Sequence, residues 1–428
     1  MTCFIRFAAL PLVILAWLAA SLDAAEHQLS LSVSAGKQDR INSPAKAVVQ
    51  IPAGFDKNSR VMLTDEAGKN LPGQLSLLLD MPGVAAKSEN GKMFVAIHFI
   101  LPELAAGKQA KYGVTISTAA AANQPTVFKW TDTPGQHSEL ALGSRPVLRY
   151  MYAPLDESSP EARSATFKPY HHVFDPETGT TLLTKGPGGL FPHHRGVFFG
   201  FNRISYGEGK TADVWHCNQG EFQSHDSFLE TESGPLFGRH HLAIAWHGKA
   251  KDIFAEEIRS LMAYNLPGGT LVEFRTQLAT TGGKVKLDGD PQHAGFQFRA
   301  TQEVPDKTAK ETYYLRPDGK GEPEKFRNWD DKGRDPKTVN LPWNALCMVV
   351  GGKRYTVCYL DRPDNPKESR FSERDYGRFG SYFEYELDHE KPLHLNYRLW
   401  IQAGEMTAQQ VQKLADDFVH PAEVTLAE

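Results

Sequence analysis

The residues best suited to chemistry lie in the stretch Phe191–His216, FPHHRGVFFGFNRISYGEGKTADVWH. It holds two adjacent histidines, an arginine, an aspartate and a tryptophan around Val197–Phe201, a short apolar run of strand-forming residues. Successive side chains of an extended chain point to opposite faces, so we expect His193 and Arg195 on one face and His194 on the other. This spacing disfavours a metal held by both histidines. It favours an imidazole and a guanidinium that bind one small polar ligand, although a core histidine beside a structural ion pair fits equally well.

A second segment that could contact a ligand is Ser369–Phe383, SRFSERDYGRFGSYF. In it Arg374, Asp375 and Tyr376 form an aromatic turn that carries an acid, and an ion pair within the loop is the alternative interpretation. Between the two segments lies Leu315–Lys337, which is charged and rich in proline and glycine. We expect a surface insertion here, which could cover the site as a lid.

Several predicted strands carry an apolar side opposite a polar side, which is typical of an antiparallel sheet with one face in the core. The polar sides are rich in planar hydrogen-bonding groups, which suit vicinal hydroxyls or a carboxylate. We interpret them as the floor of a sugar-sized site, and a solvated or interdomain face is the alternative. These polar positions are Arg239, His241, Glu273, Arg275, His293, Gln297, Arg299, Asn396 and Arg398.

The whole chain has the composition of an all-β protein, with 11% aromatic residues, 36 glycines and 27 prolines. We expect a small β-sandwich over residues 26–117, a short linker, and a large antiparallel β-domain over residues 127–404. Residues 405–428 are expected to form a C-terminal helix and tail, with helical periodicity in Thr407–Val419 and Thr407 as its N-cap. A net charge of −4 argues against a nucleic-acid partner.

The N-terminus, residues 1–25, has the features of a signal peptide: Arg6, an apolar stretch and a small-residue exit. We therefore expect a secreted or periplasmic protein with no membrane span in the mature chain. Cys347 and Cys358 could face one another across a hairpin, and the sequence leaves their disulfide state open. Since no Cys-x-x-Cys pair occurs, we expect no structural zinc.

Several segments resemble the DUF6807 family, which is often labelled the "PmoA family" or methane oxygenase. They are FKPYHHVFDPETG, GGLFPHHRGVFFGF, ADVWH, HAGFQFRA and RDYGRFG, and the resemblance covers roughly residues 145–404. The chain departs from the family pattern at Leu190-Phe191, where an Asp is usual, and at Ser372-Glu373, where Trp-His is usual. The oxygenase label fits poorly, because the membrane methane monooxygenase is a multi-helix membrane protein.

The resemblance implies a β-supersandwich fold similar to that of galactose mutarotase. It also implies a bacterial protein, because members of the family are typical of bacteria that degrade polysaccharides. Such a site would need a proton donor and a proton acceptor across a sugar ring. The candidates are His193 or His293 as the acid and Glu273 or Asp213 as the base. The predicted substrate contacts are His194, Arg195, Trp215, Arg275, Gln297, Arg299, Arg374, Asp375 and Tyr376.

The sequence thus predicts a secreted carbohydrate-active protein, as an epimerase, lyase or hydrolase, whose partner is a small molecule or an oligosaccharide. A non-catalytic glycan-binding protein is the second hypothesis. A metal-dependent enzyme is the third, and its candidate ligands are His193, His240 or His241, His293 and Asp213. We assign no metal site and expect no cofactor, while a divalent metal stays open.

Overall fold

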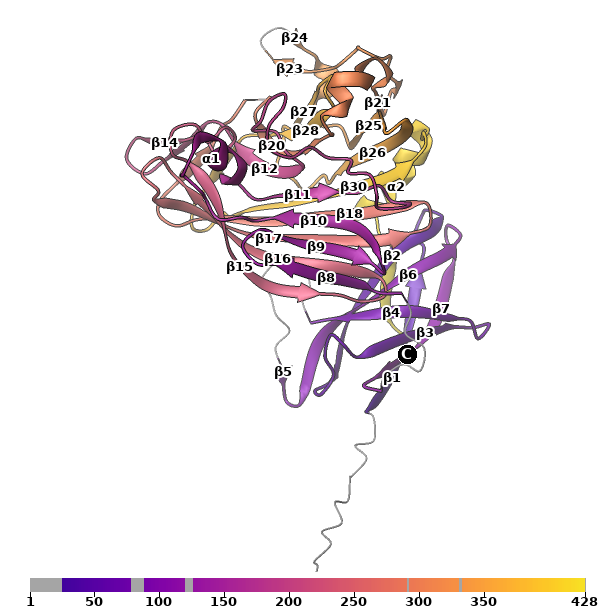
Figure 1. Ribbon diagram of the computed structural model, residues 1–428. Helices are drawn as coiled ribbons and strands as arrows, with labels where there is room; N and C mark the ends of the chain where they lie inside the picture. The colour runs from indigo at the N-terminus through magenta and orange to yellow at the C-terminus, as the bar shows by residue number, and fades with distance from the viewer. Residues whose placement is uncertain (1–24, 78–87, 120–125, 291, 331–332, 428) are drawn as a thin grey trace, which may run out of the picture.

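The computed structural model describes residues 25–77, 88–119, 126–290, 292–330 and 333–427. The predicted signal peptide lies outside these residues, apart from its last position. The described chain consists mainly of antiparallel sheets (Figure 1), which confirms the all-β fold. No helix among the described residues is long and apolar enough to cross a membrane.

The N-terminal part forms one sheet, in the order β2-β6-β4-β3-β7-β1-β31 with β5 beside β6. Its strands are β1 (Glu26–Ser34), β2 (Arg40–Pro52), β3 (Arg60–Asp65), β4 (Asn70–Ser76), β5 (Ser88–Glu89), β6 (Lys92–Leu104), β7 (Gln109–Ser117) and β31 (Glu423–Leu426). The last strand, β31, pairs with the first, so the chain end returns to this N-terminal sheet (Figure 1). The sequence predicted only a helix and tail there. The domain boundaries themselves stay predictions.

The main body contains an eight-stranded and a nine-stranded sheet. The eight-stranded main sheet consists, in spatial order, of β27 (Arg370–Glu373), β28 (Arg378–Tyr382), β20 (Ala294–Arg299), β12 (Val197–Phe201), β11 (Tyr170–Val173), β10 (Arg145–Met151), β9 (His137–Leu142) and β8 (Phe128–Thr133). The nine-stranded sheet consists of β15 (Phe222–Glu232), β16 (Phe237–His247), β17 (Ile253–Leu266), β18 (Gly269–Thr280), β30 (Leu393–Ala403), β26 (Lys353–Asp361), β25 (Trp343–Val350), β21 (Tyr313–Arg316) and β22 (Gly319–Lys320).

Smaller elements lie at the edges. They are a four-stranded sheet of β14 (Lys210–Ala212), β13 (Ile204–Tyr206), β19 (Val285–Leu287) and β29 (Tyr385–Leu387), a hairpin of β23 (Trp329–Asp330) and β24 (Gly333–Arg334), helices α1 (Pro160–Thr166) and α2 (Ala408–Val419), a π-helical turn (Val304–Thr308), and two 3₁₀ turns (Ala309–Glu311 and Pro336–Thr338).

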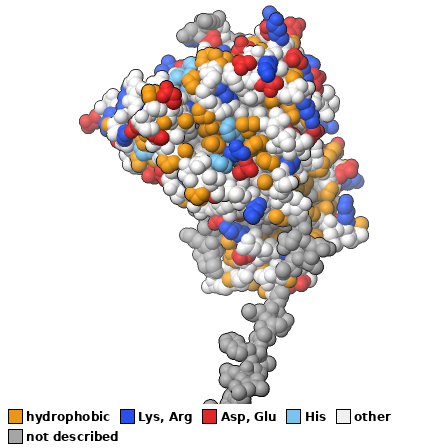
Figure 2. Space-filling model, viewed as in Figure 1, with side chains coloured by type: hydrophobic (Ala, Val, Ile, Leu, Met, Phe, Trp, Pro, Cys, Tyr) orange, Lys and Arg blue, Asp and Glu red, His pale blue; other side chains and the backbone are white. Residues whose placement is uncertain are grey.

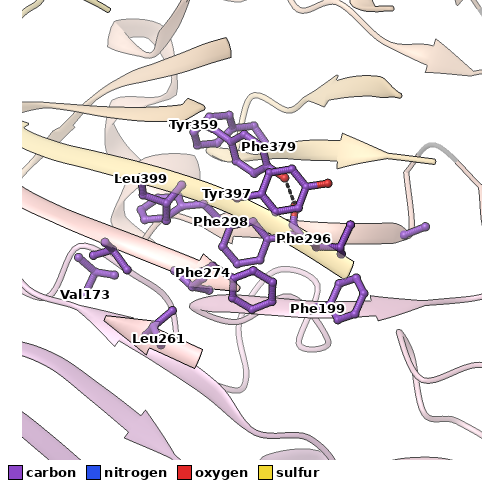
Figure 3. Close-up of a cluster of buried hydrophobic side chains, with 14 of the residues drawn as sticks. Val173, Phe199, Leu261, Phe274, Phe296, Phe298, Tyr359, Phe379, Tyr397 and Leu399 are labelled. Atoms are coloured by element: carbon purple, nitrogen blue, oxygen red, sulfur yellow. Dashed lines mark hydrogen bonds between the residues drawn. The ribbon is translucent and has the colours of Figure 1, made fainter. Parts of the chain in front are cut away.

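One apolar layer joins the two large sheets (Figure 3). Phe296 of β20 stacks on Phe274 of β18, with ring centroids 4.1 Å apart, and contacts Tyr397 of β30 at 5.3 Å. The Tyr359 hydroxyl donates to the Phe296 carbonyl (3.2 Å), so this buried hydroxyl is satisfied. Since alternate residues of each strand enter this layer, the residues between them face outward from the sandwich.

Helix α2 covers part of the outer face of the nine-stranded sheet and confirms the predicted C-terminal helix. The Thr407 hydroxyl accepts from Gln410 N (3.2 Å) and the Gln410 side chain accepts from Thr407 N (2.8 Å), a capping box that satisfies two backbone donors. Val411 and Phe418 are buried in a second apolar cluster, together with Trp343 of β25. The indole of Trp343 also donates to Gln412 (2.8 Å).

The cysteines do not form the bridge left open by the sequence. Cys347 and Cys358 lie on the two strands of the expected hairpin, but the register pairs Cys347 with Thr356 and Cys358 with Ala345. All three described cysteines are buried and free.

Histidines occupy buried positions in several parts of the main body. His240 stacks on Trp130 with ring centroids 3.3 Å apart, and His171 stacks on Tyr150 at 4.6 Å. Burial lowers the pKa of both imidazoles well below the usual value, and it lowers the pKa of His172 to about 4. Figure 2 shows histidine side chains at the surface of the main body, some of them among hydrophobic side chains.

These buried histidines predict a loss of stability in mild acid. The unfolded chain takes up protons near pH 6.5, whereas the folded imidazoles stay neutral to lower pH, so stability is full above pH 6.5 and falls below it. Each such histidine contributes a slope of up to about 1.4 kcal/mol per pH unit. Urea denaturation between pH 7.0 and 5.5, above the range in which carboxylates titrate, should show the decrease. A flat profile there would contradict the assignment.

Candidate functional site

Three histidine rings meet at the edge of the main body. One ring nitrogen from each of His193, His216 and His293 lies within 4.8 Å of the other two. His216 lies two residues after Val214, whose N–H donates to the carbonyl of Phe201 at the end of β12 (3.1 Å). The carbonyl of His293 accepts from the N–H of Asn202, the residue that follows Phe201 (3.0 Å). Two of the histidines are thus fixed at the same strand end, and the loop before β12 brings the third against them.

Two aspartates orient two of these rings. Asp213 Oδ2 lies 2.8 Å from His216 Nδ1, while its Oδ1 accepts from the backbone N–H groups of Trp215 (3.0 Å) and His216 (2.8 Å). Asp290 Oδ1 lies 2.9 Å from His293 Nδ1. Because each carboxylate engages Nδ1, each imidazole keeps Nε2 for another partner.

The surroundings of Asp290 stabilise its carboxylate. Burial opposes ionisation, but hydrogen bonds from His293, Gln292 and Asn202 outweigh burial and lower the pKa of Asp290. Asp290 therefore acts as a fixed negative charge behind the His293 ring.

His193 is the third ring, and its environment keeps it neutral. Its Nε2 is buried and has no partner among the described residues. Burial lowers the pKa of His193 to about 2, and the neighbouring Lys168, His216 and His293 add to the effect. A neutral imidazole suits a metal ligand, whereas a general acid at neutral pH must carry a proton. The environment therefore disfavours the predicted role of His193 as an acid.

The face assignment for the HHR motif is wrong. The N–H of His194 donates to the carbonyl of Phe191 (3.0 Å), so the histidines lie in a turn and the strand begins only at Val197. The rings of His193 and His194 therefore contact one another, with centroids 4.2 Å apart. His194 Nε2 accepts from the indole N–H of Trp215 (3.2 Å), which makes both side chains part of the wall behind the three histidines.

Arg195 is a structural residue in this fold. Its side chain is fully buried and donates to the carbonyls of Ser164 (2.7 Å), Ala165 (3.2 Å) and Pro192 (3.0 Å). The guanidinium also lies 4.2 Å from the ring centroid of Phe167. All these contacts hold the loop against α1, so the predicted substrate contact of Arg195 gains no support.

The predicted polar floor is divided between two opposite faces. Glu273 and Arg275 lie on the outer face of the nine-stranded sheet, whereas Gln297 and Arg299 lie on the outer face of the eight-stranded sheet. Alternation shows which side of a strand is polar, but not which sheet the strand joins. The two groups therefore do not share one floor.

Glu273 is held by arginines far from the histidines. It accepts from Arg398 and Arg275, the latter at 3.4 Å. Burial opposes ionisation of Glu273, but these two guanidiniums lower its pKa to about 2. Glu273 is thus an ion-pair partner on the other face and cannot serve as a base beside His193.

The second sequence landmark does reach the histidines. The ring of Tyr376 stacks on His194 (centroids 5.9 Å, interplanar angle 14°), and Arg299 lies 4.8 Å from the Tyr376 ring and donates to its carbonyl. Gln297 accepts from Arg378 (2.9 Å) on the same face. These residues form a basic, aromatic wall next to the three histidines.

The two remaining residues of that turn have local roles. Asp375 is exposed and accepts from the N–H of Tyr376 (2.9 Å), and Arg374 lies 3.9 Å from Asp330. The alternative interpretation of this turn, an ion pair between Arg374 and Asp375, is therefore not observed between these two described residues.

A cleft of about 620 Å³ opens beside His293. Trp329, Asp330 and Arg334 of the predicted insertion line it, so that insertion does reach the site. The complete lining is Arg203, Asp290, Gln292, His293, Trp329, Asp330, Arg334, Arg370, Tyr382 and Glu384.

Sequence reasoning missed three functional candidates: His216, Asp290 and Trp329. A signal for the first two was present, because Asp-x-x-His occurs at both Asp213–His216 and Asp290–His293. In each case the aspartate accepts from the ring Nδ1 three residues later. Trp329 had no such signal, because its position depends on how a long insertion folds over the sheet.

Comparison with known proteins identifies the family. A family described as "Family of unknown function (DUF6807)" matches residues 137–416, which is more than half of the chain, so the protein belongs to this family. No curated protein matches. An alpha-mannosidase from Enterococcus faecalis V583 is similar in structure at 9% identity and a TM-score of 0.44, and the match covers 94% of this chain but 46% of the mannosidase chain. The chain thus spans less than half the length of that enzyme.

The structural role of Arg195 is testable by substitution. Arg195→Met would leave three carbonyls without their donor, so the free energy of unfolding should fall by roughly 3 kcal/mol or more. Urea denaturation without any ligand measures this change. As a control, the exposed Arg60→Met should change it by less than about 0.5 kcal/mol. An Arg195 variant as stable as the parent would return Arg195 to the list of ligand contacts.

Proposed function

We propose that this DUF6807 protein is a metal-dependent enzyme that acts on a sugar or oligosaccharide in the cleft beside His293. The observation that carries the proposal is the meeting of three imidazoles, two of them with Nδ1 held by a carboxylate. Carboxylate–histidine–metal arrangements of this kind orient the ring and raise the basicity of the ligand nitrogen. This is the third hypothesis drawn from the sequence, a metal-dependent enzyme, and it replaces the expectation of a site without a cofactor.

The geometry suits a first-row divalent cation such as zinc. Catalytic zinc sites use three protein ligands and keep one position open, and imidazole also suits copper, iron and nickel. With metal–nitrogen distances of about 2.0–2.1 Å, tetrahedral ligand nitrogens stand roughly 3.3 Å apart. The present limit of 4.8 Å requires only a small inward movement of the rings.

A bound cation would polarise a substrate oxygen or lower the pKa of a bound water to about 7. The protein's own groups would prepare that chemistry. Asp213 and Asp290 fix the tautomers of His216 and His293, and the stacked rings of His194 and Tyr376 form one wall. The role of Asp213 differs from the one predicted from the sequence: it would position the ring of His216 and would not act as the base.

The size and the lining of the cleft favour a polyhydroxylated substrate. Its volume of about 620 Å³ lies within the range of small-molecule sites, roughly 300–1,000 Å³. Guanidinium, carboxylate and amide groups line it, and such groups bind vicinal hydroxyls with fixed geometry. The rings of Trp329 and Tyr382 supply apolar surface for the faces of a sugar.

A second candidate function is metal-free acid–base catalysis. The observation that favours it is the His293–Asp290 pair, which lines the cleft at 2.9 Å. Here His293 would transfer the proton, as the sequence predicted, and Asp290 would replace Glu273 as its carboxylate partner.

Metal analysis separates the two candidates. Protein purified without a histidine tag and loaded with zinc should hold about one equivalent by mass spectrometry, and His216→Ala or His293→Ala should hold less than about a tenth. Asp290→Asn should weaken metal affinity by roughly 10- to 100-fold, because the outer partner of a ligand is lost. The exposed His394→Ala serves as control. A parent protein that binds no metal on reconstitution removes the proposal.

Substrate turnover tests the second half of the proposal. A panel of oligosaccharides, sugars and oxidised sugars should yield a product that disappears with chelator and returns with metal. Trp329→Ala should raise KM roughly three- to tenfold through the loss of one aromatic contact. Product formed without metal would favour the acid–base candidate, and binding without any product would favour a glycan-binding protein.

A further inference from the structure

A second cavity of about 410 Å³ lies between the N-terminal sheet and the outer face of the nine-stranded sheet. Strands β2 and β6 supply one wall, and β16, β17, β18 and β30 supply the other. Phe418 of α2 also lines it. The cavity shares no lining residue with the cleft beside His293, so the two are separate features of the molecule.

Hydrogen bonds and a ring contact fix the two walls relative to one another. The side chain of Gln74 on β4 accepts from the backbone N–H groups of Leu236 and Phe237, at 3.1 Å each, and donates to the carbonyl of Phe237 (3.2 Å). The ring of His98 packs edge-on against that of Phe237, with centroids 4.9 Å apart. These contacts join the N-terminal sheet to β16, so the cavity is preformed, as ligand sites usually are.

Three side chains of the lining have hydrogen-bonding atoms that are unused. His98 of β6 is 5% exposed, and His241 of β16 is 3% exposed. Among the described residues, no partner is found for His98 Nε2, for either ring nitrogen of His241, or for Asn396 Oδ1. Buried polar groups are normally paired, because an unpaired group has lost its water without a replacement. The cavity therefore offers hydrogen-bonding atoms to a ligand from both of its walls.

The surroundings keep both imidazoles neutral. Burial lowers the pKa of His98 well below its usual value and lowers the pKa of His241 to about 3, and the charge of Arg239 adds to the effect in both cases. A neutral imidazole has one donor and one acceptor nitrogen, so His241 can donate to one hydroxyl and accept from another. Asn396 Oδ1 adds a further acceptor. This combination suits hydroxyl groups, which both donate and accept.

The charged side chains of the lining are already paired. Every guanidinium there forms an ion pair with a carboxylate, and the pairs are Arg239–Glu232, Arg275–Glu273, Arg362–Asp364, Arg398–Glu273 and Arg398–Asp417. Lys46, the remaining cation of the lining, has a partner as well. A charged group of a ligand would lose its water here without an unpaired counter-charge to compensate. The lining therefore favours an uncharged ligand.

We propose that this cavity binds a neutral, hexose-sized sugar whose hydroxyls form hydrogen bonds with His98, His241 and Asn396. The volume of the cavity lies within the range of small-molecule sites, roughly 300–1,000 Å³. The rings of Tyr264 and Phe418 supply flat apolar surface for the C–H groups of the sugar. The site does not depend on the proposed metal-dependent activity. A bound sugar would contact both the N-terminal sheet and the main body.

Isothermal titration with glucose, galactose and mannose tests the site, because galactose and mannose each differ from glucose in the orientation of one hydroxyl. At least one of these hexoses should bind saturably, and the corresponding uronic acid at least about tenfold more weakly. His241→Leu should weaken hexose binding at least about tenfold. Its melting temperature without ligand should stay the same or rise, since this imidazole makes no hydrogen bond that would be lost. His98→Leu, on the other wall, is the second variant should the first fail to fold.

Two control variants locate the binding. The exposed His394 lies on β30, and His394→Leu should keep the parent affinity. Trp329→Ala alters the cleft beside His293 and should keep it as well. Hexose binding that survives in both His98→Leu and His241→Leu would overturn the cavity site, and its loss in Trp329→Ala would place the sugar in the cleft instead. Equal or tighter binding of the uronic acid would overturn the neutral assignment, and no binding of any hexose would overturn the whole inference.

Discussion

The packing of two sheets on one apolar layer determines where the polar side chains of the main body can lie. Phe274, Phe296 and Tyr397 fill this layer in mutual ring contact. Each of these residues turns its neighbours outward, because side chains alternate along a strand. The layer therefore sends Glu273 and Arg275 to one outer face, and Gln297 and Arg299 to the other. Polar groups from β18 and β20 therefore cannot meet in one site, because the apolar layer separates their faces.

This constraint also explains how far the sequence could be interpreted. Alternation in β18 and β20 was predicted correctly, because it depends only on neighbours along one strand. The assignment of both strands to one floor was wrong, because sheet membership depends on pairings between distant segments, such as β18 with β30 and β20 with β12. The capping box of α2 was predictable for the same local reason. The return of β31 to the first strand was not, because nothing near Glu423–Leu426 specifies a partner so far away in sequence.

The candidate site follows the same division between local and distant information. The Asp-x-x-His pairs at Asp213 and Asp290 are local turns, and each would have been found by asking which carboxylate could reach a ring nitrogen. Their meeting with His193 is not local, because the two pairs stand 77 positions apart in the sequence. The HHR motif misled because a turn was interpreted as a strand. Because of this turn, the ring of His193 lies beside those of His216 and His293. Arg195 instead stabilises the loop through hydrogen bonds to the carbonyls of Ser164 and Pro192.

Charge balance is the strongest physical argument about what the three imidazoles can hold. The neighbourhood already contains cations, since Arg378 and Lys168 both disfavour a proton on His193. Burial lowers the pKa of Lys168 to about 7, so that side chain can reach neutrality at little cost. Protons on His216 and His293 would be balanced by Asp213 and Asp290, but a proton on His193 would add a positive charge to a ring whose buried Nε2 has no hydrogen-bond partner among the described residues. A divalent cation differs, because three neutral nitrogens would bind it directly while Asp213 and Asp290 supply two negative charges through the rings of His216 and His293. The carboxylates are therefore placed where they neutralise a metal more effectively than they could assist a proton on His193.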